Sequence, residues 1–334
     1  MLNSTAESTS LHIQAEGHSL SRWAFSALII GALCIAFSPI LVRLSELPPT
    51  ATAFHRVFLA LPFFLAWNAM GAHRNFSGLG KERKPSPIAP NTGGTETRPG
   101  RSVFWAAAAG LFFAGDLAFW HWSINYTSVA NATLLANLAP VFVTLIAWLL
   151  FGEHITGRFL AGMIIAILGT SLLVRASVGL SGQHLLGDLL GTITAVFYAG
   201  YMLSMKQLRR TSSTPQAMGM STGFTAVVLL GLVLVTQEPL LAPTYRGWLI
   251  LLGLALVSQT IGQGLIAYGL AHLPASFSSV TLLIQPAAAA LLAWVILAEP
   301  LTWWQAAGGA LVIVGIRITR RASTQAVAEL RPAR

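Results

Sequence analysis

The chain is a succession of long apolar segments separated by short polar breaks. Each segment holds about twenty mostly apolar residues, the length at which an α-helix crosses the hydrocarbon core of a bilayer. Ten such segments can be marked, and they predict an all-α integral membrane protein with ten transmembrane helices. They lie near residues 23–42, 50–70, 103–123, 128–150, 158–174, 186–205, 217–236, 247–270, 275–297 and 301–318.

The polar stretches divide these segments unevenly. Residues 1–21 are polar and lack the basic start of a signal peptide, so the first apolar segment is expected to be an uncleaved span. Residues 71–101 carry charges, prolines and glycines without an apolar period, which predicts a flexible loop between the second and third spans. A further break at 175–183 follows the fifth span, and a short basic tail at 321–334 ends the chain.

The stretch from Asp116 to Glu153 combines an apolar helical hairpin with polar residues that lipid does not tolerate on an exposed face. It reads as the end of one span, a short turn near 124–127 and a second span that ends at Glu153. Pro140 lies inside the second span and cannot donate a hydrogen bond to the carbonyl of Ala136, so that carbonyl needs another partner.

Residues 264–299 repeat this pattern, and a shift of 146 positions aligns the two copies without a gap. The matched positions are Pro140 with Pro286, Leu145 with Leu291, Trp148 with Trp294, Glu153 with Glu299, Thr156 with Thr302, Gly162 with Gly308 and Gly169 with Gly315. So many matches predict an internal duplication, with one repeat at 22–175 and the other at 185–320. Because each repeat has five spans, an odd number, the second is expected to be inverted relative to the first.

These features resemble the drug/metabolite transporter superfamily, and within it the EamA-like families. The resemblance is carried by a helix with a proline in its middle, a stretch of small residues and tryptophan, a terminal glutamate and a closing helix with spaced glycines. It covers residues 22–320. It implies a secondary transporter that works by alternating access. Export, an amino-acid-like substrate and a bacterial inner membrane rest on the resemblance alone.

The composition agrees with a membrane protein, because 54% of the residues are hydrophobic and only 9% are charged. The net charge of +9 raises the question of nucleic acid as a partner, but the basic residues lie in loops beside spans, where topology explains them. If the N-terminus is cytoplasmic, sixteen of the twenty lysines and arginines face the cytoplasm. Both termini and the loop at 71–101 are therefore predicted to be cytoplasmic.

Asp116 is the candidate functional residue that the pattern singles out most sharply. It lies inside the third span, which carries no lysine or arginine, and an acid there costs about 2.5–3.5 kcal/mol on insertion scales. Trp120, four residues later, is expected on the same helix face. Asp116 binds a cationic substrate group, titrates as a proton site, or joins helices through a fixed ion pair, and the sequence leaves these three roles open.

Arg56 lies in the second span at a depth similar to that of Asp116, roughly 10–12 Å from the same surface. Three roles are open for it as well. It pairs with Asp116, it binds a substrate carboxylate with its bidentate fork, or it extends to the outer surface.

Other polar residues in the spans are candidates either for the wall of a substrate cavity or for contacts between helices. They are Asn137, Tyr198, Gln263 and Gln285. His121 is a second candidate proton site, with an interfacial histidine as the alternative. It stands five residues after Asp116, about 140° around the helix, so the two are expected on different faces.

The sequence favours neither an enzyme nor a cofactor. It contains no nucleotide-binding GxxxxGK[ST] loop, no GxSxG elbow, no HExxH helix and no metal-ligand spacing. Two alternatives to a transporter stay open, an intramembrane enzyme that uses Asp116 and His121 and a membrane scaffold that transports nothing. The expected partners are a small-molecule substrate, the lipid bilayer and, for a coupled carrier, a proton. Nothing indicates an oligomeric state.

The charge distribution generates a test of topology. In a Cys34→Ser, Pro90→Cys protein, an impermeant thiol reagent added to intact cells should leave position 90 unlabelled, and opening the cells should allow labelling. Labelling from outside intact cells would contradict the predicted orientation.

Overall fold

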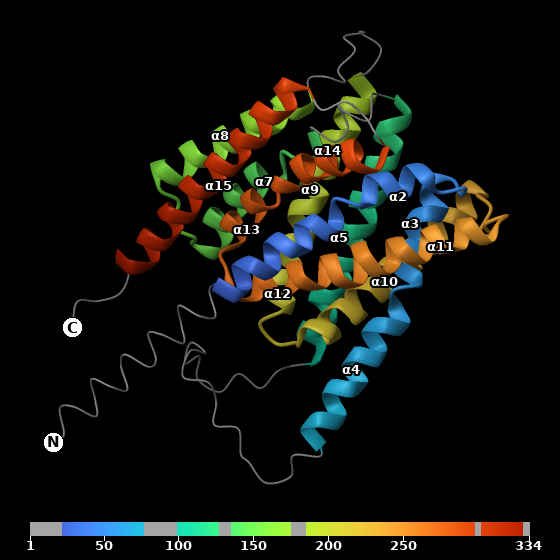
Figure 1. The fold of residues 1–334 in the computed structure, drawn as a ribbon. Coiled ribbons are helices and arrows are strands. Elements are labelled where there is room, and N and C mark those ends of the chain that lie inside the picture. Colours follow the sequence, from blue (N-terminus) through green and yellow to red (C-terminus); the bar gives the residue numbers. More distant parts are fainter. Residues whose placement is uncertain (1–21, 77–98, 127–134, 175–184, 298–301, 330–334) are drawn as a thin grey trace.

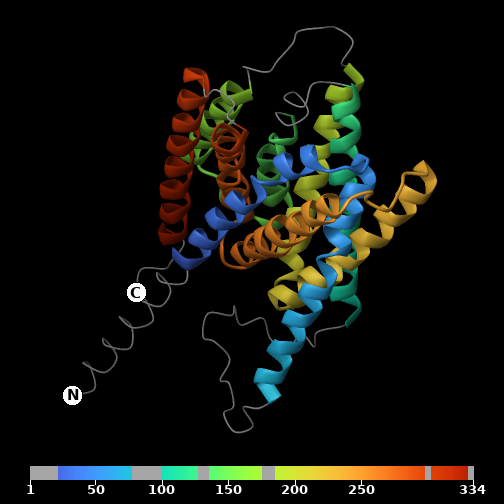
Figure 2. The ribbon, with the colours of Figure 1, turned by 45° about the vertical axis from the view of Figure 1, so that its right-hand side comes forward.

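The computed structural model describes residues 22–76, 99–126, 135–174, 185–297 and 302–329, and all regular elements in these ranges are helices (Figures 1 and 2). Seven helical segments in this part of the chain are long and apolar enough to cross a membrane. They are Arg22–Leu44, Pro49–Met70, Gly100–Ser123, Leu185–Leu208, Thr214–Thr236, Tyr245–His272 and Ala275–Ile296. Two further apolar helices, Ala139–Phe151 and Gly157–Leu173, are shorter.

Residues 22–35 form the first described helix, which has no label in Figure 1. The labelled elements begin with α2 and continue to α15 near the C-terminus (Figure 1). Their bounds are α2 Ser38–Leu44, α3 Pro49–Phe58, α4 Leu61–Phe76, α5 Pro99–Tyr126, α7 Ala139–Phe151, α8 Gly157–Val174, α9 Leu185–Leu208, α10 Thr214–Thr236, α11 Tyr245–Gly253, η2 Leu254–Gln263, α12 Gly264–His272, α13 Ala275–Thr281, α14 Ile284–Leu297 and α15 Trp303–Glu329.

The predicted boundaries need correction in three places. α5 continues to Tyr126, so residues 124–126 are helical where a turn was predicted near 124–127. α4 continues to Phe76 and α5 begins at Pro99, so the predicted loop at 71–101 was too long at both ends. Its residues 77–98 lie outside the described part of the chain, as does the predicted break at 175–183. α15 extends to Glu329, so a helix continues into the segment predicted as a tail after residue 320.

Several predicted spans are interrupted helices rather than continuous ones. Turns lie at residues 36–37, 59–60, 137–138 and 282–283. A proline follows each turn within four residues, at Pro39, Pro62, Pro140 and Pro286. Proline has no N–H to donate and its ring clashes with the preceding helical turn, which explains why α-helical bonding breaks at these points. In the segment Tyr245–His272, ten residues form the π-helix η2 instead.

Helices from the two halves of the chain pack against one another. α5 lies along α9, α8 along α15, and α10 along both α3 and α4. The first helix crosses η2 and α12, where Gly31 lies against Gly262 and Gly269 lies against Ala24 and Leu28. The interface between the halves therefore forms the centre of the molecule.

The crossing of α8 and α15 has a reciprocal glycine contact (Figure 1). Gly162 lies against Gly315, and Gly169 lies against Gly308. The earlier residue of α8 meets the later residue of α15, so the two helices run antiparallel. Glycine permits this close approach, because there is no Cβ to separate the two backbones.

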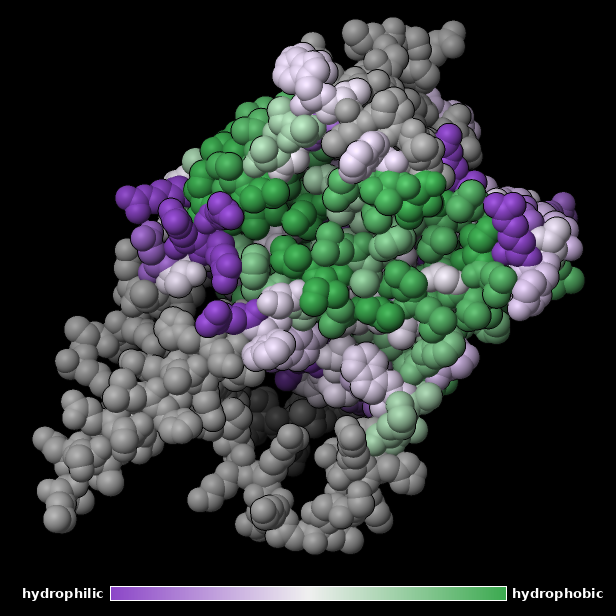
Figure 3. All heavy atoms as spheres, in the orientation of Figure 1, coloured by the Kyte–Doolittle hydropathy of each residue, from purple (hydrophilic) through white to green (hydrophobic). Residues whose placement is uncertain are grey.

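The outer surface of the bundle is apolar. Leu150, Val227 and Val235 are 72%, 71% and 80% exposed. Figure 3 shows hydrophobic residues over the middle of the visible face, with hydrophilic residues gathered at its left and right margins. Such a broad apolar surface suits contact with lipid chains rather than water.

The close α8–α15 crossing predicts that one added methyl group lowers the stability of the protein. In Gly315→Ala, the new Cβ would lie 2.6 Å from the Gly162 carbonyl oxygen and the Ala166 amide nitrogen. The backbones must then separate, and the free energy of unfolding should fall by about 1–3 kcal/mol. Thermal unfolding of the purified protein in detergent measures this change.

Gly231→Ala in α10 is the matched control, because a Cβ there meets no atom within 4 Å. Its unfolding midpoint should stay unchanged or rise slightly, since alanine favours a helix over glycine. Equal losses in the two variants would contradict close packing at the α8–α15 crossing.

Candidate functional site

A cavity of about 190 Å³ lies between the two halves of the chain. Its wall includes residues of the first helix, α2, α3, α5, α9, η2 and α14, together with the turn before α7. It contains all the site residues predicted from the sequence: Arg56, Asp116, Trp120, His121, Asn137, Tyr198, Gln263 and Gln285. These residues come from six separate segments, and tertiary packing brings them to one place.

His121 differs from its expected position. The 140° separation from Asp116 predicted different faces of the helix, yet both residues line the cavity. The cavity therefore contacts more of the circumference of α5 than a single face. Gln259 on η2 is not among the residues that line the cavity and is 1% exposed.

Arg56 on α3 is held by residues of both halves. Its Nε donates to Oε1 of Gln259 on η2 at 3.2 Å, and its Cζ lies 5.7 Å from the centre of the Phe113 ring. The residue is 7% exposed. A hydrogen bond and an aromatic face both stabilise a buried guanidinium, and the Nη atoms at the end of the fork are where a carboxylate binds bidentately.

Asp116 on α5 lines the same cavity and is partly exposed to it. Asp116 and Arg56 do not form a direct ion pair. Among the described residues, an ion pair with an N···O distance below 4.0 Å joins Lys206 and Glu153 instead. Opposite charges thus share one small cavity without neutralising each other by contact. Such an arrangement leaves room for a solute that carries both a cationic and an anionic group.

Aromatic and amide side chains connect Arg56 with α9. The rings of Phe113 and Tyr201 stack with their centres 4.6 Å apart, and the centre of the Tyr198 ring lies 6.0 Å from that of Tyr201. The hydroxyl of Tyr201 donates to Oε1 of Gln263 at 3.4 Å. This contact joins α9 to the last residue of η2. The wall beside Arg56 is therefore aromatic and fixed by hydrogen bonds.

Three of the four turns that interrupt helices lie at the cavity, whereas the turn at 59–60 contributes no residue to its wall. Ala36 and Pro39, Asn137, and Gln285 with Pro286 all lie at or beside a turn and all line it. η2 contributes Leu254 and Gln263. Non-helical backbone at membrane depth is tolerated where it faces a cavity, and π-helical turns occur often at functional sites. The irregular backbone is thus concentrated where a solute would lie.

Sequence reasoning missed Ser38 and Thr194, which also line the cavity. The hydroxyl of Ser38 is buried without a hydrogen-bond partner among the described residues. A signal for it was present, because Ser38 immediately precedes Pro39 in an apolar span, as Gln285 precedes Pro286. Thr194 carries no comparable signal, since threonine is common in membrane helices.

Comparisons with known proteins agree on a family. The model of the EamA-like transporter family matches residues 22–175 and again residues 185–321. An uncharacterized transporter from Archaeoglobus fulgidus is 27% identical, over 90% of this chain and 99% of its own. The pseudopaline exporter CntI from Pseudomonas aeruginosa is 27% identical, over 61% of this chain and 70% of its own. A probable amino-acid metabolite efflux pump from Salmonella typhimurium is 28% identical, over 61% and 72%.

A solved crystal structure superposes with a TM-score of 0.70, covering 92% of this chain and 98% of the other. Its sequence is 20% identical, so the likeness concerns the fold alone.

The Arg56–Gln259 contact generates a stability prediction. Gln259→Leu keeps the size of the side chain but leaves the buried Nε of Arg56 without its acceptor. The free energy of unfolding should fall by about 1–3 kcal/mol, which a lower unfolding midpoint in detergent would report. Gln325→Leu is the matched control, because Gln325 accepts from Arg158 at 3.3 Å on the exposed surface. Its effect should stay within about 0.5 kcal/mol. A neutral Gln259→Leu would contradict the role of Gln259.

Proposed function

Because this chain belongs to the EamA-like transporter family, we propose that it is a secondary transporter that exports a small polar or amphipathic metabolite, such as an amino acid. The family consists of transporters rather than enzymes, and membership confirms the resemblance seen in the sequence. The observation that carries the proposal is the cavity between the two halves, where Arg56 and Asp116 are both present without direct pairing.

The proposed architecture is ten membrane crossings in two inverted repeats of five, residues 22–175 and 185–320. The antiparallel α8–α15 crossing supports it. Gly162 and Gly308 are equivalent positions of the two repeats, as are Gly169 and Gly315. Exchanging the repeats therefore converts the contact of Gly162 with Gly315 into the contact of Gly308 with Gly169, and both contacts are present. A two-fold axis that relates equivalent antiparallel helices must lie in the membrane plane, and such an axis inverts one repeat relative to the other.

The remaining contacts between the halves support the same relation. The third span packs on the sixth, as α5 on α9, and the first span packs on the eighth. The first span corresponds to the sixth and the third to the eighth, so exchanging the two repeats converts one of these contacts into the other. It leaves the contact between the second and seventh spans, α3 with α10, unchanged. Rocking one repeat against the other then exposes the cavity to alternate sides.

The proposed orientation has both termini and the loop at 71–101 on the cytoplasmic side of a bacterial inner membrane. The positive charge of those segments supports it. On α3 the cavity residues Ala53 and Arg56 then lie toward the outer end of the span, whereas on α9 Thr194 and Tyr198 lie near the middle of the helix.

The chemistry of the cavity favours a solute with both charges. Arg56 presents donors to a carboxylate, and Asp116 presents acceptors to an ammonium group. Trp120, Phe113 and Tyr198 offer aromatic surface to the remainder of the molecule. The names of two relatives, a pseudopaline exporter and a probable amino-acid metabolite efflux pump, support outward transport, and the second also supports amino-acid-like compounds. Asp116 and His121 are the candidate proton sites for a coupled carrier.

The proposal is tested by Asp116→Asn, which keeps the shape of the side chain but removes its charge. Transport of amino acids into inside-out vesicles should fall at least about tenfold, equal to about 1.4 kcal/mol of lost differential binding, while the protein stays inserted and folded. If Asp116 served to compensate the charge of Arg56, the same change would instead lower stability by roughly 3–5 kcal/mol.

The double variant Arg56→Leu/Asp116→Leu separates these cases. It should be stable, because both charges are removed together, and inactive, because the solute loses both its partners. A stable and active double variant would contradict substrate binding by the two residues. Vesicles that move no solute at all with the parent protein would contradict transport itself.

A further inference from the structure

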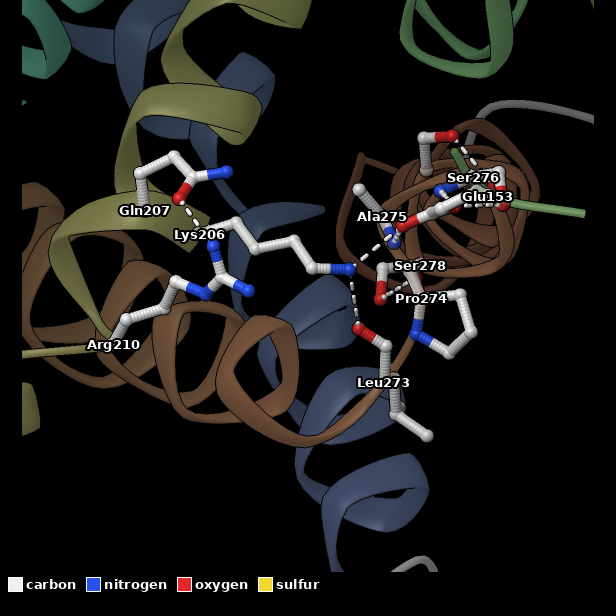
Figure 4. A network of polar contacts seen from close by, with 10 residues as sticks. Glu153, Lys206, Gln207, Arg210, Leu273, Pro274, Ala275, Ser276 and Ser278 are labelled. Atoms are coloured by element: carbon white, nitrogen blue, oxygen red, sulfur yellow. Dashed lines mark hydrogen bonds and ion pairs between the residues drawn. The ribbon is translucent and has the colours of Figure 1, made fainter. Parts of the chain in front are cut away.

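A second polar network lies apart from the cavity, where α7 of the first half meets the second half (Figure 4). Oε1 of Glu153 accepts from Nζ of Lys206 at 2.7 Å and from the amide of Ala275 at 2.8 Å. Oε2 accepts from the amide of Ser276 at 3.2 Å and from its hydroxyl at 2.6 Å. Lys206 also donates to the Leu273 carbonyl at 3.3 Å. One carboxylate therefore joins α7 to α9 and to the start of α13.

The charge of Glu153 is maintained by this network. Burial alone raises the pKa of its carboxyl group, but the Lys206 ammonium and the hydrogen bonds from Ser276 and Ala275 outweigh burial and leave the pKa below its usual value. Glu153 is thus ionised at neutral pH. Its side chain is 14% exposed and that of Lys206 is 24% exposed. Charge-assisted hydrogen bonds that are so shielded hold more firmly than surface ion pairs.

The backbone before Glu153 is built to turn at this point. Gly152 ends α7 with φ of 63°, in the left-handed region that favours glycine. The amide of Glu153 then donates to the Ala147 carbonyl at 3.1 Å. The chain leaves the helix in a fixed direction, with the Glu153 carboxylate against α13 as Figure 4 shows.

The network and the cavity lie at different levels along the same three segments. On α9, Tyr198 lines the cavity and Lys206 follows eight residues later, about 12 Å further along. On the segment of α13 and α14, Ser276 precedes the cavity residue Gln285 by nine residues. Asn137 lines the cavity just before α7, and Glu153 follows that helix. These three segments connect the cavity to the network.

Between cavity and network the helices are closely packed. All seven residues of α13 are buried. Ala147 on α7 and Met202 and Met205 on α9 are 0% exposed. A solute in the cavity therefore has no passage toward the end of the bundle where the network lies.

We propose that Glu153 and Lys206, with the first residues of α13, form the gate that closes the cavity on the cytoplasmic side. The proposal rests on the proposed transport function and its orientation. For a solute to enter from the cytoplasm, α7 must separate from α9 and α13, because these helices close the passage. That separation breaks the four hydrogen bonds that Glu153 accepts from Lys206, Ala275 and Ser276. The network thus stabilises the conformation in which the cavity is closed to the cytoplasm.

The experiment measures access to a cysteine placed inside the closed gate. Ser279 lies one turn after Ser276 on α13 and is 2% exposed. A Cys34→Ser, Ser279→Cys protein in inside-out vesicles should react slowly with an impermeant maleimide. Adding Glu153→Gln should raise the labelling rate about tenfold. This corresponds to a decrease of about 1.4 kcal/mol in the free energy needed to open the gate. Lys206→Met should raise it as well, and it replaces Glu153→Gln if that variant fails to fold by size-exclusion chromatography.

Glu238→Gln is the matched control. Glu238 also joins the two halves, since its Oε2 accepts from the Ala51 amide at 2.8 Å, but it does so at the other end of the bundle. Its labelling rate should match the parent. An unchanged rate in the Glu153 and Lys206 variants, or an equal rise with Glu238→Gln, would overturn the gate. Because labelling requires no solute, the gate can be tested even if every transport assay fails, and transport can be tested even if the gate is wrong.

Discussion

The position of Arg56 depends on a contact between the two halves of the chain. A guanidinium in a membrane span is costly unless protein groups replace water around it. Gln259 supplies a hydrogen bond from the second half, and Phe113 supplies an aromatic face from the first. Arg56 is therefore placed only when η2 and α5 are both packed against α3. The charged wall of the cavity is a product of the assembled bundle and does not exist in either half alone.

The same constraint explains why the irregular backbone lies where it does. Carbonyl groups released by Pro39 and Pro140 would be unsatisfied in lipid. The turns before these prolines place the released backbone beside the cavity instead. Close helix crossings compensate elsewhere, as at Gly31 with Gly262 and along α8 and α15. Close glycine contacts where helices cross and broken helices beside the cavity are two consequences of one rule.

The bundle has two polar centres of different character. The cavity presents opposite charges that make no direct ion pair, with aromatic surface around them, which suits an exchangeable solute. The network at Glu153 has its carboxylate fully engaged by Lys206 and by α13, which suits a contact that is either made or broken. α9 and the α13–α14 segment contribute residues to both centres, and α7 connects Asn137 at the cavity to Glu153 in the network, so movement of these helices affects the two together. Coupling between a site and its gate requires such a shared element.

The sequence by itself determined the class of protein, the approximate positions of the helices and the residues worth attention. Hydropathy over some twenty residues reports a span reliably, because a helix must satisfy its own backbone in lipid. A charge such as Asp116 inside a span stands out for the same reason. The duplication was also visible, since Pro140, Glu153 and Gly162 recur at a fixed distance.

Only the tertiary structure decided which of these residues meet. Helical periodicity gives the face of a residue but not the helix opposite that face, so it separated Asp116 from His121, which line one cavity. Proline marked where a helix could break, yet the π-helix η2 and its contact with Arg56 had no local signal. The partners of Glu153 lie 53 and 122 or more residues away in the sequence. Contacts over such separations depend on how whole helices pack, and a single sequence does not encode that in any local pattern.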